Sequence, residues 1–170
     1  RLRIPAWCQD ARVRVNDEPE QKGLSRGEFA LMRRTWKAGD VVTLDLPMDW
    51  RLVRGCQAQS GRVAVMRGPM VFCFNPARNK ATAEMNPLLI VFDPDSLAGP
   101  SIANGFRPDA MTATAKAWRP GSWYPFAEAS LELTLSEFAD PGGQLTYLFV
   151  PNPKEASFVD DELMRRPPMP

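Results

Sequence analysis

Short segments in which apolar and polar residues alternate, separated by proline and glycine, constrain this chain more than any other feature. The alternation is clearest at residues 11–15, 41–46 and 131–136, and the 170 residues include 17 prolines. A period of two residues is that of a half-buried strand, whereas proline inside a helix removes a hydrogen bond and clashes with the preceding turn. Short strands with Gly and Pro turns are typical of a sandwich or barrel. We therefore predict an all-β fold, namely an antiparallel β-sandwich of jelly-roll-like form or two small sandwiches in tandem.

The domain division rests on one polar stretch and on the proline-rich end of the chain. Strand patterns in residues 1–76 predict a first β-sandwich region, and the polar residues 77–87 predict a linker or long loop. Residues 88–153 predict a second sandwich region or the strands that complete the first. Residues 154–170 predict a Pro-rich tail that wraps a surface or frays. Because alternation is already under way at Arg1, we expect the chain to be part of something longer.

The charge balance excludes several classes of partner. The chain has 21 Lys and Arg against 20 Asp and Glu, a net charge of +1, so no field exists to draw nucleic acid or an anionic membrane. No apolar run approaches the ~20 residues that a membrane helix needs, and the residue order of a signal peptide is missing. We predict a soluble chain with no nucleic-acid and no membrane partner. The compartment stays open between cytoplasmic and exported.

The absence of histidine narrows the chemistry of the chain. It removes the commonest general base and the commonest metal ligand. The three cysteines, Cys8, Cys56 and Cys73, lack CxxC spacing, and we interpret each as a small buried hydrophobe. One disulfide is the alternative in an exported protein. We predict no catalytic residue, no metal ligand and no cofactor in this chain.

Two acidic groups are dense enough to be considered as catalytic pairs. They are Asp93 with Asp95 and residues 160–162 (DDE). A glycosidase needs two carboxylates that face each other across a sugar, whereas acids adjacent in Pro-rich loops are more often solvated turn formers. We interpret both groups as turn formers. Calcium held by the loop at residues 93–95 is the alternative, although that loop lacks the ligand number of a recognised calcium loop.

Four aromatic residues cluster near Pro120, Gly121 and Pro125 and are the candidate binding residues of the chain. They are Trp118, Trp123, Tyr124 and Phe126. A flat aromatic ring in a loop can stack on the apolar face of a sugar, which predicts a carbohydrate-binding loop. The alternative is that the rings cap the core or lie against a neighbouring domain.

Three stretches in a fixed order carry a family resemblance. They are residues 2–7 (LRIPAW), 36–48 (WKAGDVVTLDLPM) and 63–72 (VAVMRGPMVF). In this order they resemble the C-terminal β-sandwich region of glycoside hydrolase family 127. This is the β-L-arabinofuranosidase-like group, also described as domain of unknown function 1680. The second half of the chain departs from the family pattern, which leaves the sugar open.

The resemblance implies a larger parent protein. Such a parent has an (α/α)6 catalytic barrel followed by β-sandwich domains, and family members remove L-arabinofuranose or related sugars from plant-type glycans. The resemblance further implies a cysteine nucleophile, glutamates and a cysteine-bound zinc, all carried by the barrel. Cys8, Cys56 and Cys73 do not match the family's catalytic cysteines, so no catalytic residue is transferred to this chain.

Three functions follow as hypotheses. The first is a non-catalytic accessory sandwich that packs on and stabilises the N-terminal catalytic barrel of the same polypeptide, which predicts an exposed apolar face. The second is a carbohydrate-binding module that uses the loop at residues 118–126 on plant-type glycans. The third is a cell-surface or assembly module, because a fold does not fix a function. We predict that the chain alone is not an enzyme, and the resemblance implies that the parent is a glycoside hydrolase.

Overall fold

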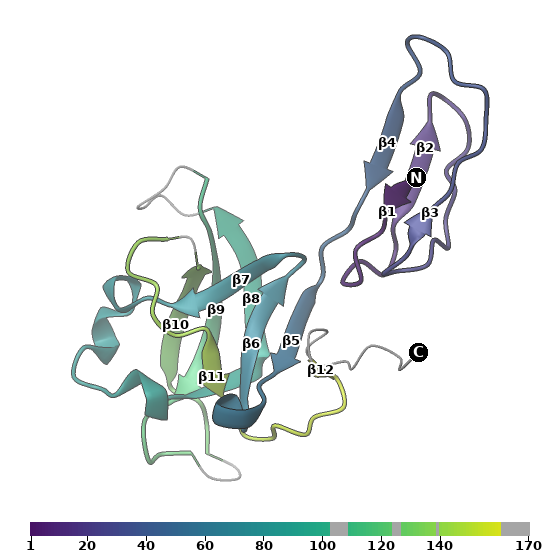
Figure 1. The fold of residues 1–170 in the computed structure, drawn as a ribbon. Helices are drawn as coiled ribbons and strands as arrows, with labels where there is room; N and C mark the ends of the chain where they lie inside the picture. Colours follow the sequence, from purple (N-terminus) through teal and green to yellow (C-terminus); the bar gives the residue numbers. More distant parts are fainter. Residues whose placement is uncertain (103–108, 124–126, 139, 161–170) are drawn as a thin grey trace. The chain divides into compact units, whose positions relative to one another are not determined.

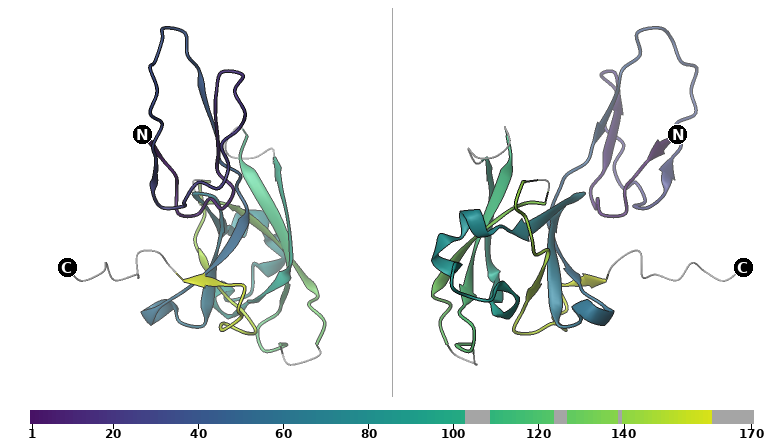
Figure 2. Two further views of the ribbon diagram at one scale, coloured as in Figure 1. Left: turned by 90° about the vertical axis from the view of Figure 1, so that its right-hand side faces the viewer. Right: turned by 60° about the vertical axis from the view of Figure 1, so that its left-hand side comes forward.

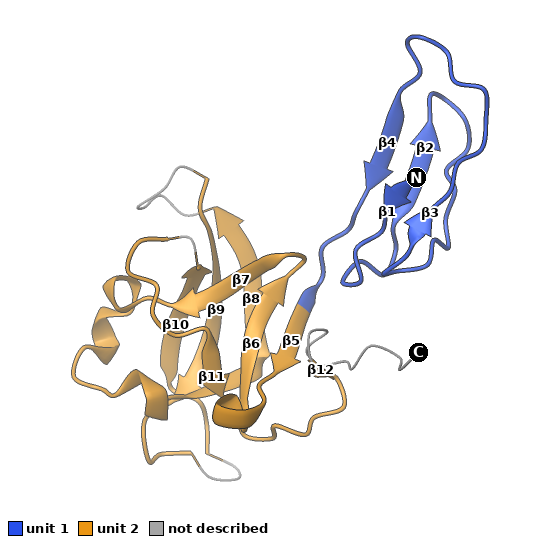
Figure 3. Cartoon of the chain, in the orientation of Figure 1, with its two compact units in different colours: residues 1–50 blue, residues 51–170 orange. Residues whose placement is uncertain are grey.

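The computed structural model describes residues 1–102, 109–123, 127–138 and 140–160. These residues form strands and four short 3-10 helices, with no α-helix among them, so the all-β prediction is confirmed. No helix in this part of the chain is long and apolar enough to cross a membrane. The chain divides into two compact units, residues 1–50 and 51–170 (Figure 3).

Unit 1, residues 1–50, consists of two short antiparallel ribbons (Figure 1). Its strands are β1 (Leu2–Arg3) paired with β3 (Phe29–Ala30), and β2 (Arg12–Val15) paired with β4 (Val42–Asp45). The alternation in β2 places Val13 and Val15 inside and turns the arginines outward, as the sequence predicted. Buried Ile4, Cys8 and Ala11 form a small core, and side chains from both ribbons pack on it, including Ala30 and Leu44.

Unit 2 is built on one sheet of eight strands. The strands are β5 (Trp50–Arg54), β6 (Arg62–Arg67), β7 (Met70–Phe74), β8 (Val91–Ile102), β9 (Met111–Trp118), β10 (Leu131–Glu137), β11 (Tyr147–Phe149) and β12 (Val159–Asp160). Their order is β11-β8-β9-β10-β7-β6-β5-β12, and β11 also pairs with β6. Six strands therefore form a closed ring, which can be followed in Figure 2. Within the ring only the β11–β8 pairing is parallel.

The ring is a barrel-like sheet where the sequence predicted a jelly-roll-like sandwich of two sheets. Its interior is lined by alternating apolar residues such as Leu133 and Leu135 of β10 and by the small side chains Ala113, Ala115 and Ala117 of β9, all buried. Small residues suit the narrow interior of a barrel with few strands. Alternation marks the buried face of each strand but does not say which strands are neighbours. Closure through the three-residue β11 could not be seen in the sequence pattern.

The predicted linker at residues 77–87 lies inside unit 2, between β7 and β8. It falls within a run of 3-10 helices, η2 (Pro76–Arg78), η3 (Lys80–Thr82) and η4 (Pro87–Leu89); the fourth 3-10 helix, η1 (Gln57–Gln59), precedes β6. Asn75 and Asn86 each stand before a proline and accept a hydrogen bond from the backbone N–H two residues on, which is why helical turns start there. The structure thus divides its compact units at residue 50, whereas the sequence suggested a division at 77–87.

Candidate functional site

A large bulge in β8 forms one wall of a groove in unit 2. From Asp93 to Ala98 the chain advances five residues on β8, while the paired strand β9 advances two, from Lys116 to Thr114. The extra residues stand out of the ladder, and Ser96 Oγ accepts the hydrogen bond of the Lys116 backbone N–H at 2.7 Å. A side chain therefore replaces the backbone partner that the bulge removed, and the Lys116 N–H keeps a hydrogen-bond acceptor.

The groove lies on the outer face of β8, β9 and β10 and has a volume of about 570 Å³. Its side chains come from the bulge (Asp93, Asp95 and Ser96) and from the outward positions of the other two strands (Thr114, Lys116, Glu132 and Thr134). The register places Asp93, Lys116 and Glu132 in one row across three strands. Thr114 and Thr134 form the next row. The groove therefore combines three carboxylates, one ammonium and three hydroxyls.

Two charged side chains of the groove, Lys116 and Glu132, make no described ion pair or hydrogen bond at contact distance. Burial raises the pKa of Asp93, partly offset by the hydrogen bond that its carboxylate accepts from the Asp95 N–H. Lys116 lies between two carboxylates in the register, and its positive charge partly counters the effect of burial on the pKa of Asp93. Asp93, Asp95 and Glu132 outnumber Lys116, so the groove repels anions. Free donors and acceptors stand side by side on its walls.

The predicted aromatic site is only partly within the described structure. Trp118 ends β9 on the same outward face as Thr114 and Lys116, and its indole Nε1–H donates to the Ala127 carbonyl at 2.9 Å. Trp123 is 38% exposed in the loop that follows. Tyr124 and Phe126 lie outside the described residues. Whether these four residues bind a carbohydrate stays a prediction.

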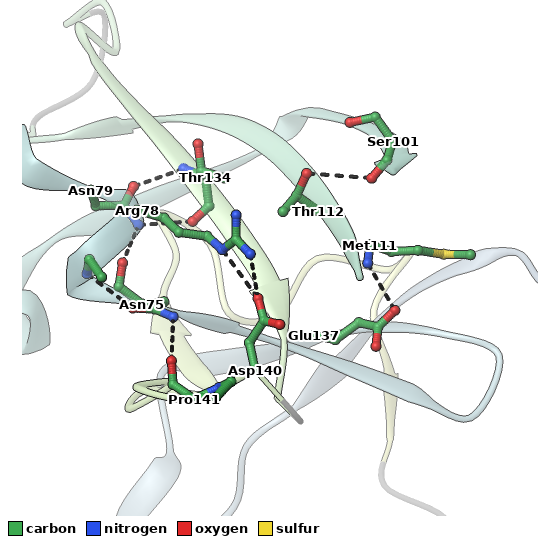
Figure 4. Close-up of polar contacts among 11 residues, drawn as sticks. Asn75, Arg78, Asn79, Ser101, Met111, Thr112, Thr134, Glu137, Asp140 and Pro141 are labelled. Carbon is green, nitrogen blue, oxygen red and sulfur yellow. Dashed lines mark hydrogen bonds and ion pairs between the residues drawn. The ribbon is translucent and has the colours of Figure 1, made fainter. Parts of the chain in front are cut away.

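A buried polar network beside β10 holds one wall of the groove in place (Figure 4). The side-chain amide of Asn79 donates to the Thr134 carbonyl and accepts from the Thr134 N–H, both at 2.8 Å. β7 pairs with β10 only at Leu135 and beyond, so this amide takes the place of a neighbouring strand. The same amide nitrogen also donates to the Asn75 carbonyl at 2.9 Å. The outward side chain of Thr134 is thereby fixed from beneath.

An ion pair anchors the other end of this network. Arg78 contacts Asp140 Oδ2 through Nε at 3.2 Å and through Nη2 at 2.7 Å, and the Asp140 side chain is fully buried (Figure 4). Asn75 Nδ2 donates to the Pro141 carbonyl at 3.1 Å. These bonds tie the 3-10 helices to the segment between β10 and β11. The sequence analysis missed this network, because nothing in the spacing of polar residues 75–79 links them to residue 140.

The two acidic groups that the sequence analysis considered as catalytic pairs lie in different places. Asp160 pairs with Arg54 at 3.0 Å on the surface, and residues 161 and 162 lie outside the described structure. Asp93 and Asp95, interpreted as solvated turn formers, do lie in the bulge and also line the groove. Lys116 and Glu132 were not predicted as groove residues. The alternation at 131–136 already placed Glu132 opposite the apolar face and could have signalled it.

The cysteines do not form a zinc site in the described part of the chain. Cys8 and Cys73 are buried, as predicted, and burial raises the pKa of both thiols. Cys56 is exposed, so its prediction as a buried hydrophobe is wrong: it precedes the surface turn η1. No described group of three or more cysteine or carboxylate ligands could hold a metal ion. The zinc implied for the parent therefore does not fit these residues.

The chain resembles known proteins in sequence. Residues 1–48 match the family model described as "Beta-L-arabinofuranosidase, GH127 middle domain". Over 84 residues the chain is 36% identical to the non-reducing end β-L-arabinofuranosidase of Bifidobacterium longum subsp. longum. That alignment covers 46% of this chain and 12% of that protein. The matched family region is the middle domain, whereas the sequence analysis suggested the C-terminal sandwich region.

Solved structures extend the likeness over most of the chain. A GH127 β-L-arabinofuranosidase of Geobacillus stearothermophilus T6 has a TM-score of 0.62 and 26% identity, covering 88% of this chain and 26% of that one. A structure described as a glycoside hydrolase has a TM-score of 0.68 at 23% identity, covering 87% of this chain and 27% of that one, which shows a shared fold. The chain thus spans about a quarter of these proteins. Residues 1–48 are therefore similar to the middle domain of glycoside hydrolase family 127, and the chain as a whole shares its fold with solved structures of that family.

Proposed function

We propose that the chain is a non-catalytic accessory region of a larger glycoside hydrolase, and that it packs on and stabilises the catalytic barrel of the same polypeptide. The observation that carries this proposal is the number of exposed large apolar side chains in unit 1, which together are called its apolar surface below. Phe29 and Val41 are each 61% exposed and Trp36 is 47% exposed, and Leu31 and Val42 are exposed as well. A unit of 50 residues with so few buried side chains is marginal by itself.

The chemistry of this apolar surface suits a protein partner. The guanidinium of Arg3 lies 5.5 Å from the Phe29 ring centre, and that of Arg34 lies 5.3 Å from the Trp36 ring centre. Aromatic and arginine side chains are enriched in the centres of protein interfaces. Since the chain spans only about a quarter of the similar solved chains, the remaining part of such a polypeptide is a natural occupant of this surface.

The proposal also covers the parent. Its relatives are named β-L-arabinofuranosidases, and we infer that the parent hydrolyses β-L-arabinofuranosides, with its catalytic groups and any zinc outside this chain. Asp140 and Asp160 are not candidates for catalysis in this chain, because Asp140 is paired with Arg78 and Asp160 with Arg54. A glycosidase requires instead two carboxylates free to face the sugar.

Two measurements test the proposal. The purified 170-residue chain should not hydrolyse an aryl β-L-arabinofuranoside, and hydrolysis that copurifies with the chain would overturn the non-catalytic role. In the whole parent protein, the double substitution Phe29→Ser and Trp36→Ser should lower the melting temperature. The matched control is Leu89→Ser, an exposed apolar residue of unit 2 (52% exposed), which should leave it unchanged. Equal melting temperatures for the double variant and the parent would contradict the packing role of unit 1.

A further inference from the structure

The outer groove of unit 2 has no part in the proposed packing role. It lies over β8, β9 and β10, whereas the apolar surface argued above belongs to unit 1. We propose that this groove is a binding site for a neutral saccharide. The proposal depends on three features: the wall that the β8 bulge builds, the unpaired polar groups, and the sign of the charge.

The bulge gives the groove a wall that an ordinary sheet face lacks. Asp93, Asp95 and Ser96 stand beside the floor residues Thr114 and Lys116 because three extra residues are accommodated on β8. The bulge is held in shape by two hydrogen bonds. Ser96 Oγ donates to the Asp93 carbonyl at 2.7 Å and accepts from the Lys116 N–H. A wall fixed by its own hydrogen bonds is preorganised, which lowers the entropic cost of binding.

The opposite wall is preorganised from beneath. The side-chain amide of Asn79 bonds both the N–H and the carbonyl of Thr134. Glu132 precedes Thr134 by two residues and points to the same outward face of β10. The Thr114 and Thr134 hydroxyls and the Glu132 carboxylate have no side-chain partner within the described ranges. These groups are free to meet a ligand.

The donor and acceptor pattern favours a sugar over other ligands. Neighbouring hydroxyls of a sugar donate to carboxylates and accept from ammonium groups, and charge-assisted hydrogen bonds are the stronger ones. The row of Asp93, Lys116 and Glu132 offers acceptor, donor and acceptor across the groove. The excess of carboxylates repels phosphates and uronates, and no described ligand group suits a metal ion. Trp118 lies two residues beyond Lys116 on the same outward face of β9, although it is not among the residues that line the groove.

Isothermal titration calorimetry on the 170-residue chain tests the site, with arabino-oligosaccharides, xylo-oligosaccharides and cello-oligosaccharides as neutral probes. Oligogalacturonate serves as the anionic probe and oligolysine as the cationic one. We expect at least one neutral probe to bind with a dissociation constant of about 1 mM, and oligogalacturonate not to bind. Absence of binding by every neutral probe at about 20 mM would overturn the proposal.

Four variants locate the binding. Lys116→Met and Glu132→Gln should each weaken it about tenfold, because each removes one charged partner of the sugar hydroxyls. Lys80→Met and Glu84→Gln make the same changes at exposed residues of the η2–η4 segment that do not line the groove, and they should bind like the unmodified chain. Circular dichroism of each variant verifies folding. Equal binding by all four variants, or oligolysine binding that weakens in Glu132→Gln while no neutral probe binds, would refute a saccharide site.

Discussion

The two units of the chain bury their side chains in different ways. Unit 2 closes its sheet into a ring, so β6 and β8 both pair with β11 and the interior is sealed by strands on all sides. Unit 1 pairs its strands only two by two, and its buried core is centred on Ile4, Cys8 and Ala11. A closed ring removes exposed edges, whereas two ribbons cannot. Unit 1 exposes five large apolar side chains within 50 residues, whereas the described part of unit 2 exposes six over twice as many residues. Closure therefore goes with a smaller share of large apolar side chains left in water.

Core truncation gives the largest expected effect. Phe92 is fully buried in the ring, and Phe92→Ala should lower the free energy of unfolding by about 3–5 kcal/mol because it leaves a cavity. Native-state hydrogen exchange measures where the loss falls. If the units unfold separately, exchange should rise at the Phe74 N–H, bonded to Leu145, and stay constant at the Val13 N–H, bonded to Gln21.

The complementary variant sharpens this comparison. Ile4 is the largest fully buried side chain in unit 1, and Ile4→Ala should raise exchange at Val13 but not at Phe74. A rise at both amides in either variant would show one cooperative unit and would break the comparison.

The buried ion pair should have the next largest effect. Arg78→Met leaves the fully buried Asp140 carboxylate without its cation, which should cost about 3 kcal/mol in chemical denaturation. The matched control is Arg12→Met in unit 1, whose pair with Asp45 spans 4.0 Å and is exposed. That variant should cost no more than about 0.5 kcal/mol. Similar losses for the two variants would mean that burial does not distinguish the ion pairs.

Asn79→Ala should lower the free energy of unfolding by a smaller amount, and the change in hydrogen exchange should be confined to Thr134. It deprives the Thr134 N–H and carbonyl of their partners, and leaving such groups unsatisfied costs about 1–3 kcal/mol. Asn86→Ala is the control, because Asn86 makes a single exposed capping bond to the Leu88 N–H. Faster exchange at Thr134 in the first variant alone would support the role of Asn79 in holding the groove wall. Unchanged exchange at Thr134 would contradict it.

Much of the strand pattern could be predicted from the sequence, but the closure of the sheet could not. Leu131, Leu133 and Leu135 alternate with polar residues and do point into the ring. The sequence of residues 111–118 does not decide between helix and strand, because its alanines suit the buried face of either element. The narrow interior of the ring explains why alanines line β9. The sequence predicts a loop at residues 93–95, because Pro94 and two aspartates break the pattern, whereas β8 runs through these residues.

Less of the candidate site than of the strand pattern could be predicted from the sequence, because its residues are brought together by pairings between distant strands. Trp118 was singled out by its type, whereas Lys116 and Glu132 become neighbours only through strand register. Register depends on pairings between residues far apart in sequence, which a local pattern does not contain. The network of Asn79, Arg78 and Asp140 is nonlocal in the same way.

The smallest effects concern two carboxylates, one in each unit, whose pKa values shift in opposite directions. In unit 1 the Asn16 side-chain amide and the Lys37 N–H donate to Asp40 and lower its pKa. In unit 2 burial raises the pKa of Asp93. A lowered pKa means that the unfolded chain binds more protons, so the contribution of Asp40 to stability grows as the pH rises. A raised pKa means the reverse, so the contribution of Asp93 falls as the pH rises through the unfolded and then the folded pKa.

Asp40→Asn and Asp93→Asn should therefore change the slope of the free energy of unfolding against pH in opposite directions. Between pH 3 and 6, a range of about one to two units around the ordinary aspartate pKa, Asp40→Asn should flatten the gain in stability with rising pH. Asp93→Asn should make that gain steeper, because it deletes a group that opposes it. Urea denaturation at several pH values measures both slopes, and Asp17→Asn, an exposed aspartate of unit 1, is the control. Shifts of the same sign in the two variants would mean that burial does not govern Asp93, and that the groove is better hydrated than its wall implies.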